Sequence, residues 1–366
     1  VVEAGPCDHS MAMEYDEEAT HQAVRWLYAA ARETDGRPFL LTVSYMHPHD
    51  PYLAPRAFWD RYEGDAIDLP EPGWTAPEKR TPAERRLHRL YDRGEYRVTN
   101  AHIRAARRAY YAMIDYADDH LGRLLTTLRT AGLADRTVLA ITADHGDMLG
   151  ERGLWYKMTF YERAMRVPLL LHAPGLLAPR RVAEPVSLID LLPTLLEVAG
   201  QRRGFRPAVP IDGESLLPAA RGRRRARGVV HAEYMAEGTA EPMFMIRRGA
   251  FKYVSAPGDP PLLFDLSRDP GETRNLAGRA ELAEVEAGFA AEVATEWDAE
   301  AIRRDVLASQ RARRLVHGAL TTGRPHAWDF QPRSDAAKAY YRDDSHPDPE
   351  RQHRLPAAGP PPRRAE

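Results

Sequence analysis

Apolar residues form two kinds of pattern in the first part of the chain. Residues 16–34 have helical spacing, whereas residues 39–46 form a continuous apolar run. A longer helix is predicted from Thr99 or Asn100 to about residue 131, where Gly132 ends it. The apolar stripe of this helix is expected to contain Ile103, Tyr110, Ile114, Ala117, Leu121, Leu124 and Leu128.

Further apolar runs at 137–142 and 167–172 follow, and then a helix at 187–198. Continuous apolar strands are typical of a sheet that is covered on both faces. A helix between two such strands favours the βαβ arrangement. The sequence therefore predicts an α/β fold with a mostly parallel central sheet and helices on both faces.

The pattern changes after about residue 211. Short strands are expected near 229–233, 243–247, 251–254 and 262–265, followed by a helix over 280–317. These elements predict a small antiparallel C-terminal sheet with a packed helix. We divide the chain into an α/β part (1–210), a small α+β part (211–320) and an extended tail (321–366). Residues 56–97 are rich in Pro, Arg and Glu, and we interpret them as an irregular surface segment.

The amino-acid composition limits the classes of function that the chain could have. The 366 residues are 43% hydrophobic and carry a net charge of −2, so nothing indicates a nucleic-acid-binding surface. The basic run at 221–227 (RGRRRAR) is interpreted as a solvated loop rather than a binding patch. A single cysteine, Cys7, excludes an internal disulfide framework and fits a cytoplasmic location. No apolar stretch reaches the roughly 18 residues of a membrane span, so no membrane partner is expected.

Two polar clusters follow predicted strands. The run at 137–142 leads into Asp144 and His145, and the run at 39–46 leads into His47 and His49. Asp144 offers a hard oxygen to a cation, His145 offers a ring nitrogen or a hydrogen bond, and Lys157 adds a positive charge. Since α/β sheets bind ligands at the edge where their strands end, the two clusters are expected to meet there.

The sequence motifs around these clusters resemble those of one protein family. The string at 141–157 (ITADHGDMLGERGLWYK) resembles the late metal-binding motif of the sulfatases, in the alkaline phosphatase superfamily, and within them the choline-sulfatase group. Further matching stretches occur in the family's order: 38–52 (PFLLTVSYMHPHDPY), 166–175 (RVPLLLHAPG), 187–200 (SLIDLLPTLLEVAG), 211–216 (IDGESL) and 264–275 (FDLSRDPGETRN). The resemblance implies hydrolysis of a sulfate ester, with choline-O-sulfate as the expected substrate.

The resemblance also implies roles for these residues. His49 would bond the sulfate and share in proton delivery to the leaving group, and Lys157 would pair with the sulfate. Asp144 would bind a divalent cation, with Ca²⁺ expected first and Mg²⁺ or Mn²⁺ as alternatives. His145 stands where many sulfatases have Asn, and it would either bind the cation or donate a hydrogen bond. His47 would either orient His49 or contact the sulfate.

A quaternary ammonium group is usually held by aromatic faces with a carboxylate nearby. Glu233 and Glu237 are candidate carboxylates, and Asp348 is a third if the tail reaches a neighbouring subunit. Such a contact, and a homotetramer, follow from the resemblance alone. The aromatic candidates Trp155, Tyr234 and Trp328 have core packing as an equally good interpretation.

The nucleophile expected of a sulfatase is not found in this sequence. The family carries it early, as a Cys or Ser in Cys-x-Pro/Ala-x-Arg that is converted to formylglycine, together with a pair of Asp metal ligands. Cys7 is followed by Asp-His-Ser-Met and does not match. We expect these groups in a preceding segment and expect the given chain alone to be inactive. Two alternatives stay open: a phosphonate monoester hydrolase or phosphodiesterase of the same superfamily, and a non-catalytic metal- or anion-binding fragment.

Overall fold

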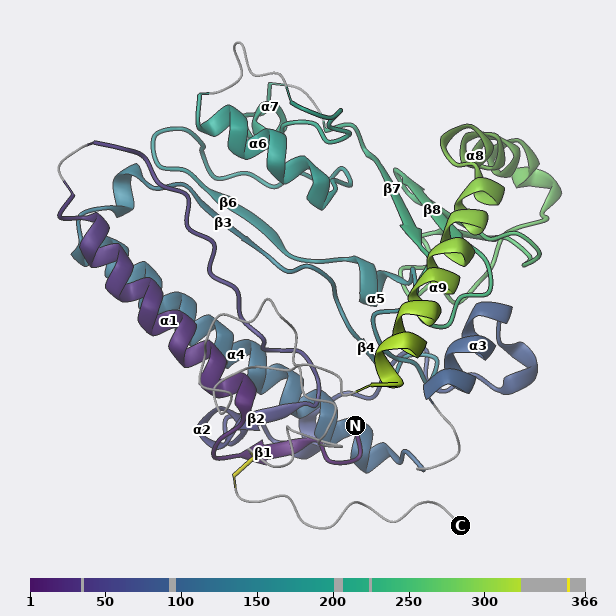
Figure 1. The fold of residues 1–366 in the computed structure, drawn as a ribbon, viewed down its shortest axis with the longest axis horizontal. Coiled ribbons are helices and arrows are strands. Elements are labelled where there is room, and N and C mark those ends of the chain that lie inside the picture. Colours follow the sequence, from purple (N-terminus) through teal and green to yellow (C-terminus); the bar gives the residue numbers. More distant parts are fainter. Residues whose placement is uncertain (34–35, 92–96, 201–206, 224–225, 324–353, 356–366) are drawn as a thin grey trace.

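The computed structural model describes residues 1–33, 36–91, 97–200, 207–223, 226–323 and 354–355. Two long helices, α1 (Met11–Ala30) and α4 (Asn100–Thr130), run side by side along one flank of the molecule (Figure 1). Ala23 and Leu27 of α1 pack there against Leu124 and Leu128 of α4. At the opposite end of these helices lies the parallel pair β1 (Gly5–Cys7) and β2 (Leu53–Pro55), followed by α2 (Arg56–Trp59).

The middle of the molecule holds the strands that lead to the polar clusters. β3 (Leu139–Thr142) pairs antiparallel with β6 (Leu169–His172), so that Leu139 faces His172. Along the chain, β3 and β6 are separated by the hairpin of β4 (Met148–Leu149) and β5 (Trp155–Tyr156) and by the short helix α5 (Glu162–Met165). Above the strands in Figure 1 lie α6 (Leu191–Val198) and α7 (Leu217–Ala220).

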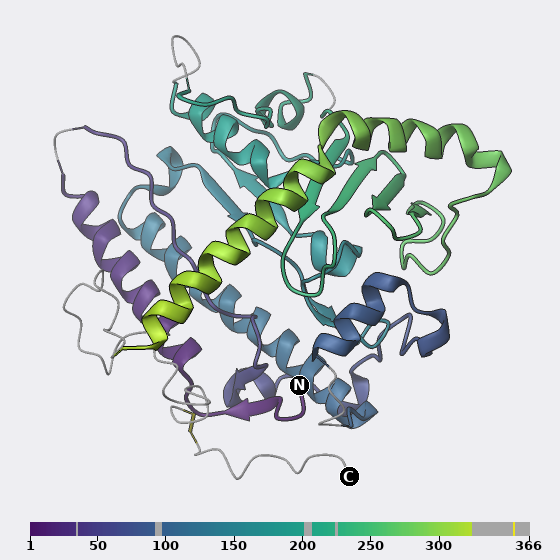
Figure 2. The ribbon, with the colours of Figure 1, turned by 45° about the vertical axis from the view of Figure 1, so that its right-hand side comes forward.

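The C-terminal part is a four-stranded antiparallel sheet. Its strands are ordered β10 (Leu262–Asp265), β9 (Phe251–Ser255), β8 (Met243–Arg248) and β7 (Val229–Tyr234). The helix α8 (Ala283–Glu296) covers it, with Phe289 packed on Ile246, Tyr253 and Leu263. The last helix, α9 (Ala299–Thr321), extends away from this sheet (Figure 2). Short 3₁₀ turns complete the described elements: Gly64–Ala66, Pro77–Lys79, Ala134–Arg136, Leu188–Asp190 and Ala280–Leu282.

The α/β class and the small antiparallel sheet with its packed helix are confirmed, but a mostly parallel central sheet is not seen within the described ranges. Residues 39–46 form no strand, although they are extended and alternate in exposure. Leu41 and Val43 pack toward α1 and α4, whereas Leu40 on the other side is 77% exposed. Leu170 of β6 is likewise 56% exposed. The segment lies beside the helices, and no strand within the described residues pairs with its backbone.

Three local predictions need correction. Residues 56–97 contain the regular helix α3 (Pro82–Tyr91), which begins with reciprocal hydrogen bonds between Thr81 and Glu84. The helix predicted over 280–317 is two helices, because Trp297 is extended and Asp298 caps α9 through the amide of Ala301. On the inward face of α4 the predicted Leu124 and Leu128 are buried, but its first half buries Ala106, Ala109, Ala112, Met113 and Tyr116 instead, while Ile114 is 46% exposed. Small residues bury there because α4 packs closely against β1 and β2.

The tail residues Asp348 and Trp328 lie outside the described residues. No helix in the described part of the chain is long and apolar enough to cross a membrane.

Candidate functional site

The loop that carries His49 is anchored by a buried carboxylate. Asp16 of α1 is fully buried, and its two oxygens accept hydrogen bonds from the amides of Met46 (2.7 Å) and His47 (3.2 Å). The ring of His47 donates its Nδ1 proton to the same carboxylate at 2.6 Å. His47 therefore points into the core, where it also meets Tyr116, and does not face the solvent side of the loop. Of the two roles considered for His47, this geometry favours orienting the loop of His49.

His49 and Lys157 come together from opposite sides of the site. Lys157 Nζ donates to His49 Nε2 at 2.7 Å, although the two residues are 108 positions apart. His49 Nδ1 donates to the backbone carbonyl and the carboxylate of Asp50, both at 3.0 Å. The hydrogen bond to Asp50 raises the pKa of His49, while burial and the charge of Lys157 act in the opposite sense. Nε2 is the ring nitrogen that faces the site.

Asp144 and His145 lie beside this pair. The rings of His49 and His145 are 5.9 Å apart, edge to face. His145 Nδ1 donates to the carbonyl of Gly146 at 2.8 Å, which leaves Nε2 on the side of Asp144, 3.6 Å from its Oδ2. Both histidines thus fix Nδ1 on a backbone carbonyl and present Nε2, the arrangement commonly found for histidines that bind metals or transfer protons.

Gly146 allows the turn that places His145. Its amide donates to Ala164 of α5 at 2.7 Å, and a Cβ atom at this position would lie 2.1 Å from the carbonyl oxygen of Arg163. Any side chain would push the strand end away from α5. Glycine is therefore needed here because two backbones approach closely.

Asp147 ties the His49 loop to the hairpin that carries Lys157. It accepts hydrogen bonds from the hydroxyl of Tyr52 (3.0 Å) and the amide of Tyr156 (2.9 Å). Both tyrosines have left-handed backbones, with φ of 57° and 69°, and their rings stack at 6.4 Å. Burial raises the pKa of Asp147 to about 7. Asp147 thus holds Tyr52 and Tyr156 in strained backbone conformations. This arrangement sets the distance between Lys157 and His49.

Asp144 and His145 supply part of a divalent-cation site. The Asp144 side chain is 88% exposed; its Oδ1 accepts a hydrogen bond from the amide of His145 at 3.0 Å, and its Oδ2 lies 3.6 Å from His145 Nε2. Oxygen-ligated Ca²⁺ takes roughly six to eight ligands, and Mg²⁺ about six. Within the described ranges no group of three or more His, Cys, Asp or Glu is placed to hold a metal. The chemistry of these two donors fits a divalent cation, and the remaining ligands would have to come from elsewhere.

The candidate residues for binding a substrate cation are not all near this cluster. Trp155 packs against Tyr52, with ring centroids 6.0 Å apart, and belongs to the apolar core. Glu233 on β7 accepts a hydrogen bond from Trp297 Nε1 at 2.8 Å. The described contacts of Glu233 therefore lead toward α8 and α9, whereas Asp348 lies outside the described residues.

Glu237 is linked to the site through tyrosines. It accepts a hydrogen bond from the hydroxyl of Tyr234 at 3.2 Å. Burial and then the charges of Glu237 and Asp50 raise the pKa of Tyr91. The ring of Tyr91 meets that of Tyr156, the residue before Lys157, at 5.6 Å. The half-exposed ring of Tyr91 therefore lies against the hairpin that carries Lys157.

Tyr91 was not a sequence candidate, because residues 56–97 were interpreted as irregular. The overlooked signal is the Thr-x-x-Glu capping box at 81–84, which predicts a helix that ends at Tyr91. Cys7, by contrast, is fully buried beside Met13, which agrees with its exclusion as a nucleophile.

Comparison with known proteins identifies the class to which this site belongs. The family model "Sulfatase" matches residues 4–201, the model of the C-terminal part of N-sulphoglucosamine sulphohydrolase matches 150–298, and the model of the choline sulfatase C terminus matches 304–353. The chain belongs to the sulfatase family.

Among the most similar relatives is the choline-sulfatase of Rhizobium meliloti, 41% identical over 93% of this chain and 67% of that protein. Arylsulfatase K of Bos taurus is 30% identical over 73% of this chain, and the chain spans about half (52%) of its length. Among solved structures, a phosphonate monoester hydrolase from Silicibacter pomeroyi has a TM-score of 0.63 at 26% identity, over 75% of this chain and 59% of that one. The similarity to this solved structure confirms the sulfatase-like α/β fold.

Proposed function

We propose that this chain provides the anion-binding, proton-donating and part of the metal-binding machinery of an enzyme that hydrolyses choline-O-sulfate to choline and sulfate. The observation that carries the proposal is the meeting of Lys157, His49, His145 and Asp144 in a member of the sulfatase family. The choline sulfatase C-terminal match and the 41% identical relative support the choice of substrate.

Each residue has a task set by the charge of a sulfate ester. Lys157 attracts the sulfuryl oxygens, and its ammonium leaves His49 Nε2 when an anion comes between them. His49 in its protonated form then donates from Nε2 to the departing alcohol oxygen, and Asp50 favours that form. Asp144 and His145 would hold a divalent cation, with Ca²⁺ as first choice, which would add positive charge beside the sulfate when bound.

A formylglycine nucleophile is proposed to come from outside the given sequence. Leu40, in the extended segment 39–46, and Leu170, on β6, are exposed apolar side chains that additional chain could cover. On this proposal the chain alone binds anions but turns over no ester.

Choline recognition is proposed to use Glu237 with Tyr91, Tyr156 and Tyr234. A quaternary ammonium offers no N–H donor, so aromatic faces and a carboxylate must hold it. The ring of Tyr91 meets that of Tyr156, the residue before Lys157, and Glu237 accepts a hydrogen bond from Tyr234. Glu233, Trp155 and Asp348 remain weaker proposals, and a homotetramer and a cytoplasmic location remain predictions.

The experiment is a choline-O-sulfate assay of the given chain, alone and together with the product of the coding region upstream. We expect release of choline and sulfate only when a Cys-x-Pro/Ala-x-Arg segment is present. Turnover by the chain alone would contradict the missing nucleophile. Failure of the joined protein to hydrolyse choline-O-sulfate would contradict the proposed function.

Substrate choice is tested with two matched variants. Glu237→Gln should raise the KM for choline-O-sulfate by roughly tenfold, the scale of a partly desolvated cation contact, and leave the KM for an uncharged aryl sulfate unchanged. Glu233→Gln, at the glutamate that accepts a hydrogen bond from Trp297, should change neither KM. The reverse pattern would move the cation site to Glu233.

A second candidate function is phosphonate monoester or phosphodiester hydrolysis, favoured by phosphonate monoester hydrolases from Silicibacter pomeroyi and Agrobacterium radiobacter at 26% and 27% identity. The same lysine and histidine would serve a phosphoryl group. Faster hydrolysis of an aryl phosphodiester than of choline-O-sulfate by the joined protein would favour it.

A further inference from the structure

A cavity of about 540 Å³ lies at the other end of the central strands from the candidate site. Its lining comes from the loop after β6 (residues 175–180) and the turn after α7 (residues 220–223). Because β3 and β6 are antiparallel, the loop after β6 leaves the strand pair at the end where β3 begins, whereas Asp144 follows the end of β3. None of the candidate site residues lines the cavity.

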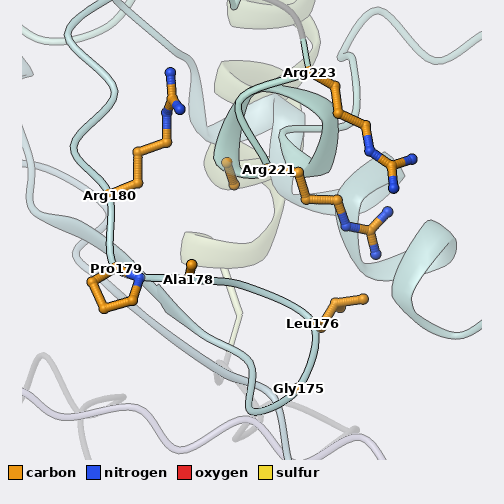
Figure 3. Close-up of a pocket in the computed structure, with 8 residues that line it drawn as sticks. Gly175, Leu176, Ala178, Pro179, Arg180, Arg221 and Arg223 are labelled. Carbon is orange, nitrogen blue, oxygen red and sulfur yellow. The ribbon is translucent and has the colours of Figure 1, made fainter.

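The cavity contains three arginines and no acidic residue. Arg180 comes from the first segment, and Arg221 and Arg223 come from the second. Figure 3 shows the side chains of Arg221 and Arg223 extending in the same direction, whereas Arg180, on the facing segment, extends in a different direction. Sequence alone interpreted the 221–227 run as a solvated loop. In the structure, Arg221 and Arg223 of this run line one side of the cavity, and Arg180, about 40 positions earlier, lines the other side.

These three guanidinium groups differ from other arginines of the protein. Arg107 and Arg248, for example, each contact a glutamate. Within the described part of the chain, Arg180, Arg221 and Arg223 contact no carboxylate within ion-pair distance. In a protein whose net charge is −2, uncompensated positive charge in one concave place favours an external anion.

A close contact between Arg180 and the backbone at Gly222 joins the loop after β6 to the turn after α7. Gly222 has φ of +70°, and a Cβ atom there would lie 2.2 Å from an Nη atom of Arg180. Arg180 thus lies directly on the backbone between Arg221 and Arg223. The amides of Arg221, Gly222 and Arg223 are all used by carbonyls of α7 and its flanks, each at 2.9 Å, so side chains rather than amides would bind an anion.

The size and lining of the cavity indicate the kind of ligand. A volume of about 540 Å³ is in the range of small-molecule pockets and far exceeds a single oxyanion. Leu176, Ala178, Pro179 and Ala220 add apolar surface beside the arginines. Guanidinium groups bind tetrahedral oxyanions in a bidentate manner.

We propose that this cavity, formed by Arg180, Arg221 and Arg223, is a second anion site, separate from the candidate active site, for an organic molecule that carries phosphate or sulfate ester groups. The proposal does not depend on the proposed function.

The test is calorimetric titration of the chain, at low ionic strength and without divalent metal, with two probes. The probes are ATP for the phosphate arm and a disulfated heparin disaccharide for the sulfate arm. We expect at least one to bind with a Kd on the order of 100 µM and to weaken as salt is raised. The tighter probe identifies the ester type.

Variants separate this site from general charge effects. Arg221→Ala and Arg223→Ala should each weaken binding about tenfold or more, while Arg274→Ala, an exposed arginine far along the chain, should change it less than about twofold. Gly222→Ala keeps the charge but displaces Arg180, and it should weaken binding as well. Absence of binding by both probes, or equal weakening in Arg274→Ala, would overturn the proposal.

Discussion

Two clusters of charged residues in this protein are built in opposite ways. In the C-terminal sheet, Lys252 is fully buried and contacts Glu162 at 3.0 Å and Glu272 at 2.6 Å. In the candidate site, Lys157 faces a histidine, and the Asp144 side chain is 88% exposed. One cluster satisfies its charges internally and joins α5 to β9, while the other leaves its charges for something outside the chain.

The pKa shifts of the buried cluster agree with this contrast. Although burial alone would raise it, Lys252 and Arg247 lower the pKa of Glu162. Burial outweighs Lys252 at Glu272 and raises the pKa of that residue. Lys252 therefore favours the charged form of Glu162, and the buried Glu272 closes the cluster on the other side of the ammonium. A charge with a buried partner stabilises the fold, and a charge without one is available for binding.

The largest expected effect is on stability. Lys252→Ala removes the cation beside the buried carboxylate of Glu272 and leaves Glu162 with Arg247 alone, and it should lower the free energy of unfolding by about 3–5 kcal/mol. Lys157→Ala, in the half-open site, should lower it by no more than about 1 kcal/mol. Urea unfolding of both variants measures the difference. Equal losses would remove the contrast between the two clusters.

Asp16→Ala should have the next largest effect. It removes the acceptor for His47 and two loop amides, and should cost about 2–3 kcal/mol of unfolding free energy. The NMR signals of the His49 ring should shift, because the loop loses its anchor. Glu17→Ala, at the next residue, is the control and should leave the His49 signals in place.

Asp147 predicts a pH dependence of stability. Its pKa of about 7 in the folded state exceeds its ordinary value of 3.8, so the folded state holds a proton that the unfolded state releases. Stability should therefore fall as pH rises from about 4 to about 7. Asp147→Asn should flatten that part of the curve in thermal unfolding at several pH values. An unchanged slope would show that Asp147 is ionised throughout.

The smallest expected effect concerns His49. Asp50 raises its pKa, so protonated His49 contributes stability that is present below 6.5 and is lost as pH rises through the folded-state pKa. Asp50→Asn should lower the pKa of His49 in an NMR titration. A higher value in the variant would contradict the assigned hydrogen bond.

Some of this structure could be predicted from sequence because it depends on local signals. The strand at Leu262–Asp265 and the helix after Thr99 begin and end where turn and cap residues place them. The missing strand at 39–46 could not be foreseen, since an apolar run shows strand tendency but not whether a partner strand is present. The packing of α4 through alanines depends on how closely its neighbours approach.

The site divides in the same way. The sequence motifs at 38–52 and 141–157 indicated His49, Asp144 and Lys157 as candidates, and the structure brings these two segments together. Sequence could not show that His47 turns inward, because that depends on Asp16, 31 positions away on α1. The tyrosines around Glu237 and the three arginines of the basic cavity likewise come from distant segments, which one sequence without homologues does not connect.

The most direct test of the account is the pKa of His49, measured by NMR titration in the wild-type chain and in Lys157→Ala. Because the ammonium of Lys157 lies 2.7 Å from Nε2 and opposes protonation, its removal should raise the pKa of His49. Lys79→Ala, which removes an exposed lysine from another segment, should leave it unchanged. A pKa of His49 that is the same in all three proteins would show that Lys157 and His49 do not share a site.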